Sequence, residues 1–180
     1  MRGPARLAAI LLAALTVTAC ATMTVGTYRA TNFLPVAYQT WSWAPPDAAP
    51  AVDPRLDGHG VFRDHLEGAV EKQLGWRGLT HVYTGVPDLW IHYHANVVQR
   101  FDVETIQRER ASCSEGECGT RVIPYDEGTI VVDVIDARTN ALVWRGWAQD
   151  SVTGIADHPG RMADYVDAAM RKIMERFPEL

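Results

Sequence analysis

Two apolar segments joined by a short polar turn limit the fold of this chain most strongly. Residues 129–135 and 142–148 each alternate apolar and other side chains, and residues 136–140 read Asp-Ala-Arg-Thr-Asn. Alternation with period two around a turn of this composition is typical of a β-hairpin. We expect Asp133 to pair with Arg145 across the hairpin, a cross-strand contact worth about 0.2–1 kcal/mol.

Two further strands are predicted within the first hundred residues. Residues 37–43 and 88–98 alternate as strands do. The alternation weakens after residue 98, so we expect a bend or bulge near Gln99 and Arg100. Residues 107–124 are charged and contain two cysteines, and they are predicted to form a long excursion from the domain.

Two segments have the apolar spacing of helices. The first is expected to begin at Asp53-Pro54, with Asp as N-cap and Pro in the first turn, and to end at Leu74, before Gly75. The second covers residues 159–176. Strands joined by hairpins and interspersed with helices predict an α+β fold, an antiparallel or mixed sheet with two main helices packed on one face. The predicted buried stripe of the second helix is Met162, Val166, Ala169, Met170, Ile173 and Phe177.

The first twenty residues have the features of an export signal. Arg2 and Arg6 precede an apolar run over residues 7–14, which is shorter than the about 20 residues that span a bilayer. The segment Val17-Thr18-Ala19-Cys20 resembles the lipobox of bacterial lipoproteins, in which the cysteine is acylated and the preceding peptide is removed. An ordinary cleaved signal with a chance cysteine is the alternative interpretation.

The lipobox resemblance implies a division of the chain into segments and a cellular location. We expect a signal peptide over 1–19, an acylated tether with a short first strand over 20–34, and a single α+β domain over 35–180. Stable anchoring takes more than one acyl chain, which a triacylated Cys20 would supply. Among lipoproteins, a residue other than Asp after the cysteine indicates the outer membrane, and Ala21 fits. The expected location is the periplasmic face of the outer membrane.

The charge of the mature chain argues against some partners. Removal of the signal leaves 161 residues and takes away two of the 17 basic residues, so 15 remain against 22 acidic ones. Lys72 and Lys172 are the only lysines in the sequence. Phosphate neutralisation carries most non-specific affinity for nucleic acids, and basic clusters bind anionic lipids. We therefore expect no nucleic-acid partner and no electrostatic attraction to anionic lipid.

Cys113 and Cys118 remain as an even pair once Cys20 is acylated. In an exported protein such a pair is expected to form a disulfide. A metal knuckle and a redox pair are the alternatives. A zinc knuckle would need further ligands, and the redox motif has two intervening residues where this pair has four.

His92 and His94 are two residues apart on a predicted strand, so their side chains point to the same face. Two imidazoles in this arrangement could hold a metal, with His81 or Asp102 as a third ligand. The alternative is a half-buried strand whose polar face carries two histidines. We favour the second interpretation, because the spacing of the sequence does not define a third ligand.

Other catalytic patterns find no support in the sequence. Asp133 and Asp136 are three residues apart and face opposite sides of a strand, and Asp136 is expected to cap the turn. The serines lie in no Gly-x-Ser-x-Gly elbow, and the glycines form no phosphate-binding loop. Trp144 and Trp147 should lie on opposite faces, one in the core and one at the surface. We expect no enzymatic activity and no cofactor.

An ordered set of short motifs resembles a bacterial lipoprotein family known as domain of unknown function forty-one thirty-six. The resemblance covers nearly all of the mature chain, and its most specific part is Asp136 with the strand Trp144-Arg145-Gly146. It implies an anchored envelope protein with an α+β domain, and it supplies no catalytic residues. The motifs are Trp41-Ser42-Trp43-Ala44-Pro45, Asp53-Pro54, Leu74-Gly75-Trp76, Pro87-Asp88-Leu89, Tyr93-His94, Tyr125-Asp126-Glu127-Gly128-Thr129, Asp133, Asp136-Ala137-Arg138-Thr139 and Val143-Trp144-Arg145-Gly146.

These observations predict a non-enzymatic envelope lipoprotein, held in the membrane through Cys20, that binds another envelope component, a protein. A free sheet edge and the loop with Cys113 and Cys118 are the expected binding surfaces. The alternatives are a periplasmic protein that uses a metal at His92 and His94, and a carrier of a small molecule or lipid in a pocket between helices and sheet.

Overall fold

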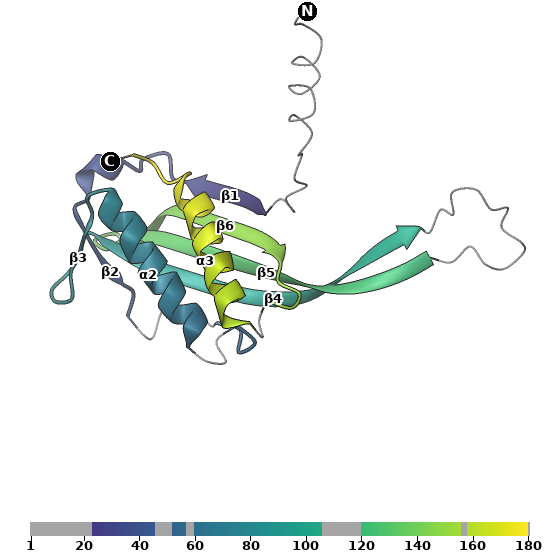
Figure 1. The fold of residues 1–180 in the computed structure, drawn as a ribbon. Helices are drawn as coiled ribbons and strands as arrows, with labels where there is room; N and C mark the ends of the chain where they lie inside the picture. Colours follow the sequence, from purple (N-terminus) through teal and green to yellow (C-terminus); the bar gives the residue numbers. More distant parts are fainter. Residues whose placement is uncertain (1–22, 46–51, 57–59, 106–119, 156–157, 180) are drawn as a thin grey trace, which may run out of the picture.

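The computed structural model of the chain describes residues 23–45, 52–56, 60–105, 120–155 and 158–179. One sheet carries both long helices on the same face (Figure 1). The predicted α+β class is confirmed. The elements are β1 (Thr24–Arg29), the 3-10 helix η1 (Pro35–Ala37), β2 (Thr40–Trp43), α2 (Val61–Trp76), β3 (Thr80–His81), β4 (Leu89–Thr105), β5 (Thr120–Asp136), β6 (Ala141–Ser151) and α3 (Pro159–Met174).

The six strands lie in the order β1-β6-β5-β4-β2-β3. The first four pair with one another in antiparallel fashion, whereas β2 is parallel to both β4 and β3, so the sheet is mixed. The strands β5 and β6 form the predicted hairpin. Its turn places Asn140 at a φ of 56°, a left-handed conformation that Asn tolerates. A register shift between Val134 and Ile135 marks a β-bulge in this hairpin.

Helix α3 covers the sheet as its sequence predicted. All six residues of the predicted stripe are buried. A helix that buries such a stripe against a sheet removes the apolar area from water and stabilises the domain. Within the part of the chain that the structure describes, neither helix is long and apolar enough to cross a membrane.

The predicted start of the first helix is wrong. The helix α2 begins at Val61, after Gly60 in a left-handed conformation, and not at Pro54. Asp53 does not cap it, because the carboxylate accepts hydrogen bonds from Arg55 and from the backbone of β4. The helix continues past Leu74, and Gly78 with a φ of 80° takes the left-handed position expected of Gly75.

Three strand predictions also need correction. β2 begins at Thr40, because Pro35–Ala37 form a 3-10 turn ahead of it. β4 pairs with β5 in one continuous register from Leu89 to Thr105, so there is no β-bulge near Gln99 and Arg100. Residues 120–124, predicted as loop, belong to β5. Residues 106–119, with Cys113 and Cys118, lie outside the described residues.

The hydrophobic core lies between the sheet and the two helices. Its largest fully buried side chains are Trp41, Trp144, Phe33, Phe62, Leu66, Leu74, Leu89, Ile91, Ile130, Met170, Ile173 and Met174. Of the two tryptophans in β6, Trp144 is in this core and Trp147 is half-buried on the other face, as predicted.

Candidate functional site

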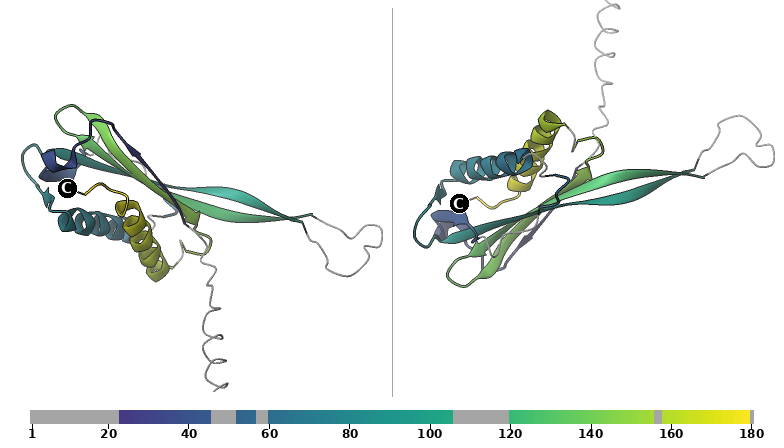
Figure 2. Two further views of the ribbon diagram at one scale, coloured as in Figure 1. Left: turned by 90° about the horizontal axis from the view of Figure 1, so that it is seen from above. Right: turned by 90° about the horizontal axis from the view of Figure 1, so that it is seen from below.

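The most unusual feature of the fold is a two-stranded arm that projects from the body (Figure 2). β6 pairs with β5 only as far as Glu127, and on the opposite edge the last strand bridge of β4 is that between Ala95 and Val52. We call residues 98–105 and 120–126 the arm. Among the described residues, the arm strands pair with each other, and only Asp126 at the base also bonds through its backbone to the body, so the outer edges are open over residues 98–105 and 120–125.

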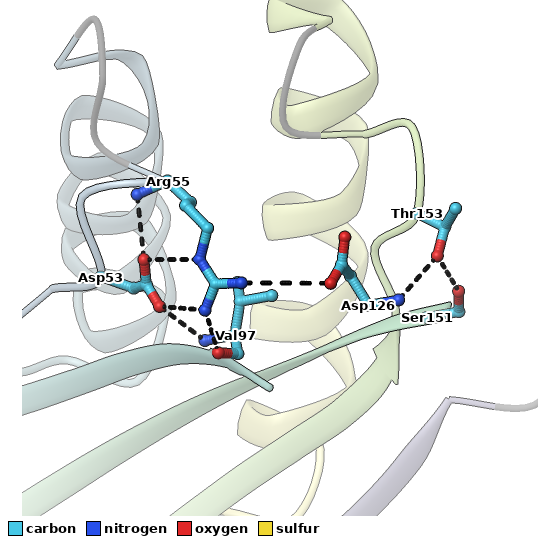
Figure 3. Close-up of polar contacts among 6 residues, drawn as sticks. All are labelled: Asp53, Arg55, Val97, Asp126, Ser151 and Thr153. Atoms are coloured by element: carbon cyan, nitrogen blue, oxygen red, sulfur yellow. Dashed lines mark hydrogen bonds and ion pairs between the residues drawn. The ribbon is translucent and has the colours of Figure 1, made fainter. Parts of the chain in front are cut away.

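On the β4 side, the base of the arm is held by the segment that precedes α2 (Figure 3). Asp53 accepts a hydrogen bond from the backbone nitrogen of Val97 at 3.2 Å, and the Arg55 guanidinium donates to the Val97 carbonyl. Arg55 Nη2 also lies 2.7 Å from Asp53 Oδ2. The hydrogen bond from the Arg55 side chain is the main cause that lowers the pKa of Asp53 to about 2.

On the β5 side, the end of β6 and the residues after it hold the base. The backbone nitrogen of Asp126 donates to Thr153 Oγ1, and the nitrogen of Val152 donates to the Asp126 carbonyl, both at 2.8 Å. Arg55 Nη1 reaches across to Asp126 Oδ1 at 4.0 Å (Figure 3). The strands are therefore fixed on both sides where they leave the body, and the arm starts from a defined direction.

The side chains of the arm are exposed. Phe101 is 62% exposed, Val122 54% and Val98 43%. Because side chains alternate along a strand, Phe101 lies on the face that Val97 presents to the core, and the cross-strand register puts Val122 on the same face. Arg100 and Asp102 lie on the other face. Val98 lies on that other face too, and Gln99 and Asp126 lie on the face of Phe101 near the base. Beyond the base, the face of Phe101 and Val122 carries exposed apolar side chains, whereas Arg100 and Asp102 are charged side chains of the other face.

The two histidines lie on the face of the sheet opposite the helices. His94 Nε2 lies 3.6 Å from Asp133 Oδ2, and His92 is opposite Asp133 in the register. The predicted pair of Asp133 and Arg145 is confirmed, with two hydrogen bonds of 2.5 and 2.6 Å. These bonds satisfy the buried Asp133 carboxylate and raise the pKa of Arg145.

The expected third metal ligands are not brought to the histidine pair. His81 stacks on Trp41, with ring centroids 4.1 Å apart, and lies 3.4 Å from Glu71. Asp102 is eight residues from His94 along β4, which is about 26 Å in a strand. Within the described ranges, no three metal-binding side chains come together.

The residues of the family motif have roles in the structure of the hairpin. Asp136 caps the turn, as expected, because its Oδ1 accepts hydrogen bonds from the backbone N–H groups of Arg138 and Thr139. A Cβ on Gly146 would meet the Trp144 ring and Ile173 Cγ2, so this position has no space for a side chain. The motif therefore stabilises the hairpin and its contact with α3.

The arm and its base were missed at the sequence level. The sequence patterns do not indicate Arg55 or Thr153, Asp126 enters only as part of a family motif, and Asp53 was interpreted as a helix cap. The contacts of the base join residues more than 25 positions apart, and no local pattern indicates them. Cys20, the residue predicted to be acylated, lies outside the described residues, as do Cys113 and Cys118.

Comparison with solved structures finds similar folds at low sequence identity. A PDZ domain protein from Parabacteroides distasonis matches with a TM-score of 0.54 and 11% identity, covering 88% of this chain and 36% of that one. This chain therefore spans about a third of the length of that protein, and at this identity the similarity concerns the fold alone. A PelC dodecamer from Paraburkholderia phytofirmans matches with a TM-score of 0.47 and 10% identity, covering 85% and 95% of the two chains.

Comparison with curated protein sequences finds no match. The family comparison does find one, and it covers nearly all of the sheet and both helices. The model of DUF4136, a domain of unknown function, matches residues 26–179, as the ordered motifs of the sequence predicted. The chain belongs to this family.

Proposed function

We propose that this protein is a lipid-anchored lipoprotein of the bacterial envelope that has no enzymatic activity and binds another envelope protein through its arm. The observation that carries the proposal is the pair of open strand edges over residues 98–105 and 120–125. Unpaired backbone groups on an exposed edge are a template for strand addition. A partner strand on the β4 edge, which has no proline, would take the place that β2 takes in the body.

The construction of the arm supports binding rather than accidental exposure. Natural proteins protect free edges with charges, prolines or very short strands. Here the β4 strand of the arm has no proline, whereas Pro124 removes one backbone donor from the β5 edge; the Arg100 guanidinium is paired with Glu127 at 2.9 Å. Because the base is fixed by Asp53, Arg55 and Thr153, little freedom is lost when a partner orders the arm.

Photocrosslinking in host envelopes tests this proposal. p-Benzoylphenylalanine replaces Tyr125 on the arm in one form and Tyr83, an exposed tyrosine of the β3–β4 loop, in a matched control. We expect position 125 to capture a specific protein, position 83 to capture none, and the capture to be lost in a Cys20→Ala form. If the anchored protein captures no specific partner from position 125, the arm is not the binding surface.

A further inference from the structure

The chain enters the sheet at the end from which the arm leaves. Thr24, the first residue of β1, pairs with Gln149, which pairs with Thr129, which pairs with Asn96. Thr24 therefore lies in the same cross-strand row as Asn96, two residues before the arm begins at Val98. Figure 1 shows the start of β1 on the arm side of the body.

The length of chain before β1 limits how far this end can lie from a membrane. Cys20 is four residues before Thr24, and a fully extended chain covers at most about 14 Å over that distance. Three strand spacings separate β1 from β4, which is again about 14 Å. If Cys20 carries the acyl chains, the premise taken over from the proposed function, the base of the arm is held beside the bilayer.

The apolar face of the arm has the residues that such a position requires. Phe101, Val122 and Pro124 are exposed on this face beyond the polar pair Gln99 and Asp126 at its base. Arg100 and Asp102 point away from it. In the body, the same face of the sheet is covered by α2 and α3, but the helices do not extend over the arm (Figure 2). Apolar and aromatic side chains on one face of an amphipathic element enter the interfacial region of a bilayer.

We propose that the Phe101 and Val122 face of the arm lies in the interface of the leaflet that holds the acyl chains. Lipid is favoured over a protein as the occupant of this face because the tether keeps the face within reach of the bilayer. The attraction is hydrophobic, which suits a chain with an excess of acidic residues. Contact with lipid would orient the open edges along the membrane, so that the partner is itself a protein at the membrane surface.

Lipid photolabelling of the acylated protein tests this inference. The protein is placed in vesicles of phosphatidylethanolamine and phosphatidylglycerol that contain a phospholipid with a diazirine in its acyl chain, and adducts are located by mass spectrometry. We expect label on Phe101 and Val122 and none on Tyr83 and Val86, which are 83% exposed in the β3–β4 loop. The double variant Phe101→Ser and Val122→Ser should lose the arm label, and the matched variant Tyr83→Ser and Val86→Ser should keep it.

The outcomes separate the two proposals. An acylated protein whose arm stays unlabelled overturns this inference and leaves the proposed function standing. A mature protein without acyl mass on Cys20 overturns the premise of both. In native envelopes, p-benzoylphenylalanine at position 101 should capture lipid, and capture of a protein in its place would overturn the lipid assignment. Circular dichroism of the arm variants, expected to match that of the unchanged protein, excludes loss of folding as the cause.

Discussion

The ribbon formed by β4 and β5 has two halves with the same backbone pairing and different surroundings. In the body, Ile91 and Val97 are 1% and 7% exposed, whereas Phe101 on the same face is 62% exposed. The register between the strands does not change from one half to the other. Burial of that face is therefore decided by where α2 and α3 end, and not by the strands themselves. A strand can keep its pairing, and the alternating direction of its side chains, where nothing covers it.

The largest effect is expected from a change that opens a cavity in the covered half. Ile91→Ala should lower the free energy of unfolding by about 2–5 kcal/mol, because the deleted methyl groups are fully buried between sheet and helices. Chemical denaturation of the mature domain measures it. A loss below about 1 kcal/mol would mean that the helices do not pack on β4 as described.

The difference between the halves also explains what the sequence could predict. The hairpin and the stripe of α3 were predicted because a buried face imposes a period of two or 3.6 on the side chains. Beyond Val97 both faces meet solvent, so the alternation of apolar and polar residues weakens. The outer part of β4 was therefore predicted to contain a bend or bulge, and the start of β5 was predicted as loop. Asp53-Pro54 carries a genuine helix-start signal, but the carboxylate is used by Val97, 44 residues away. The position of the two histidines on one face followed from alternation alone.

A second change tests how tightly the covered face is packed at β6. Gly146→Ala should lower the free energy of unfolding by about 1–3 kcal/mol, because the added Cβ would lie 2.6 Å from Ile173 Cγ2 and closer still to the Trp144 ring. Gly68→Ala in α2 is the matched control, since its Cβ would meet no atom and alanine favours the helix by about 0.5–1 kcal/mol. Thermal unfolding of both variants should therefore give shifts of opposite sign.

At the boundary between the halves, the stability supplied by Asp53 should depend on pH. Its pKa is lowered in the folded protein from 3.8 to about 2, so the contribution is complete above pH 4 and is lost as the pH falls towards 2. Asp53→Asn should cost about 1 kcal/mol at pH 7, a modest value because Arg55 is half exposed and solvent screens the pair.

Denaturation of both forms at pH 7 and at pH 2 checks the prediction for Asp53, and the gap between them should shrink at the lower pH. Hydrogen exchange adds a local test, because the Val97 amide donates to the Asp53 carboxylate and should exchange faster in the variant. A gap that is the same at both pH values would show that the charge of Asp53 does not hold the base of the arm.

The smallest effect on stability is expected on the arm, the exposed half of the ribbon. Phe101→Ala should change the free energy of unfolding by less than about 0.5 kcal/mol, because the ring is largely in water in the folded domain and loses little on unfolding. The same substitution at a buried phenylalanine such as Phe62 would cost about 3–5 kcal/mol. Denaturation of the domain without its acyl anchor, in the absence of lipid, distinguishes the two.

If Phe101→Ala is instead strongly destabilising, the arm is part of the folded core, and its exposed ring cannot be assigned to lipid. If stability is unchanged, a large solvent-exposed ring is kept on a strand that does not need it for folding, and the reason lies in what the arm contacts.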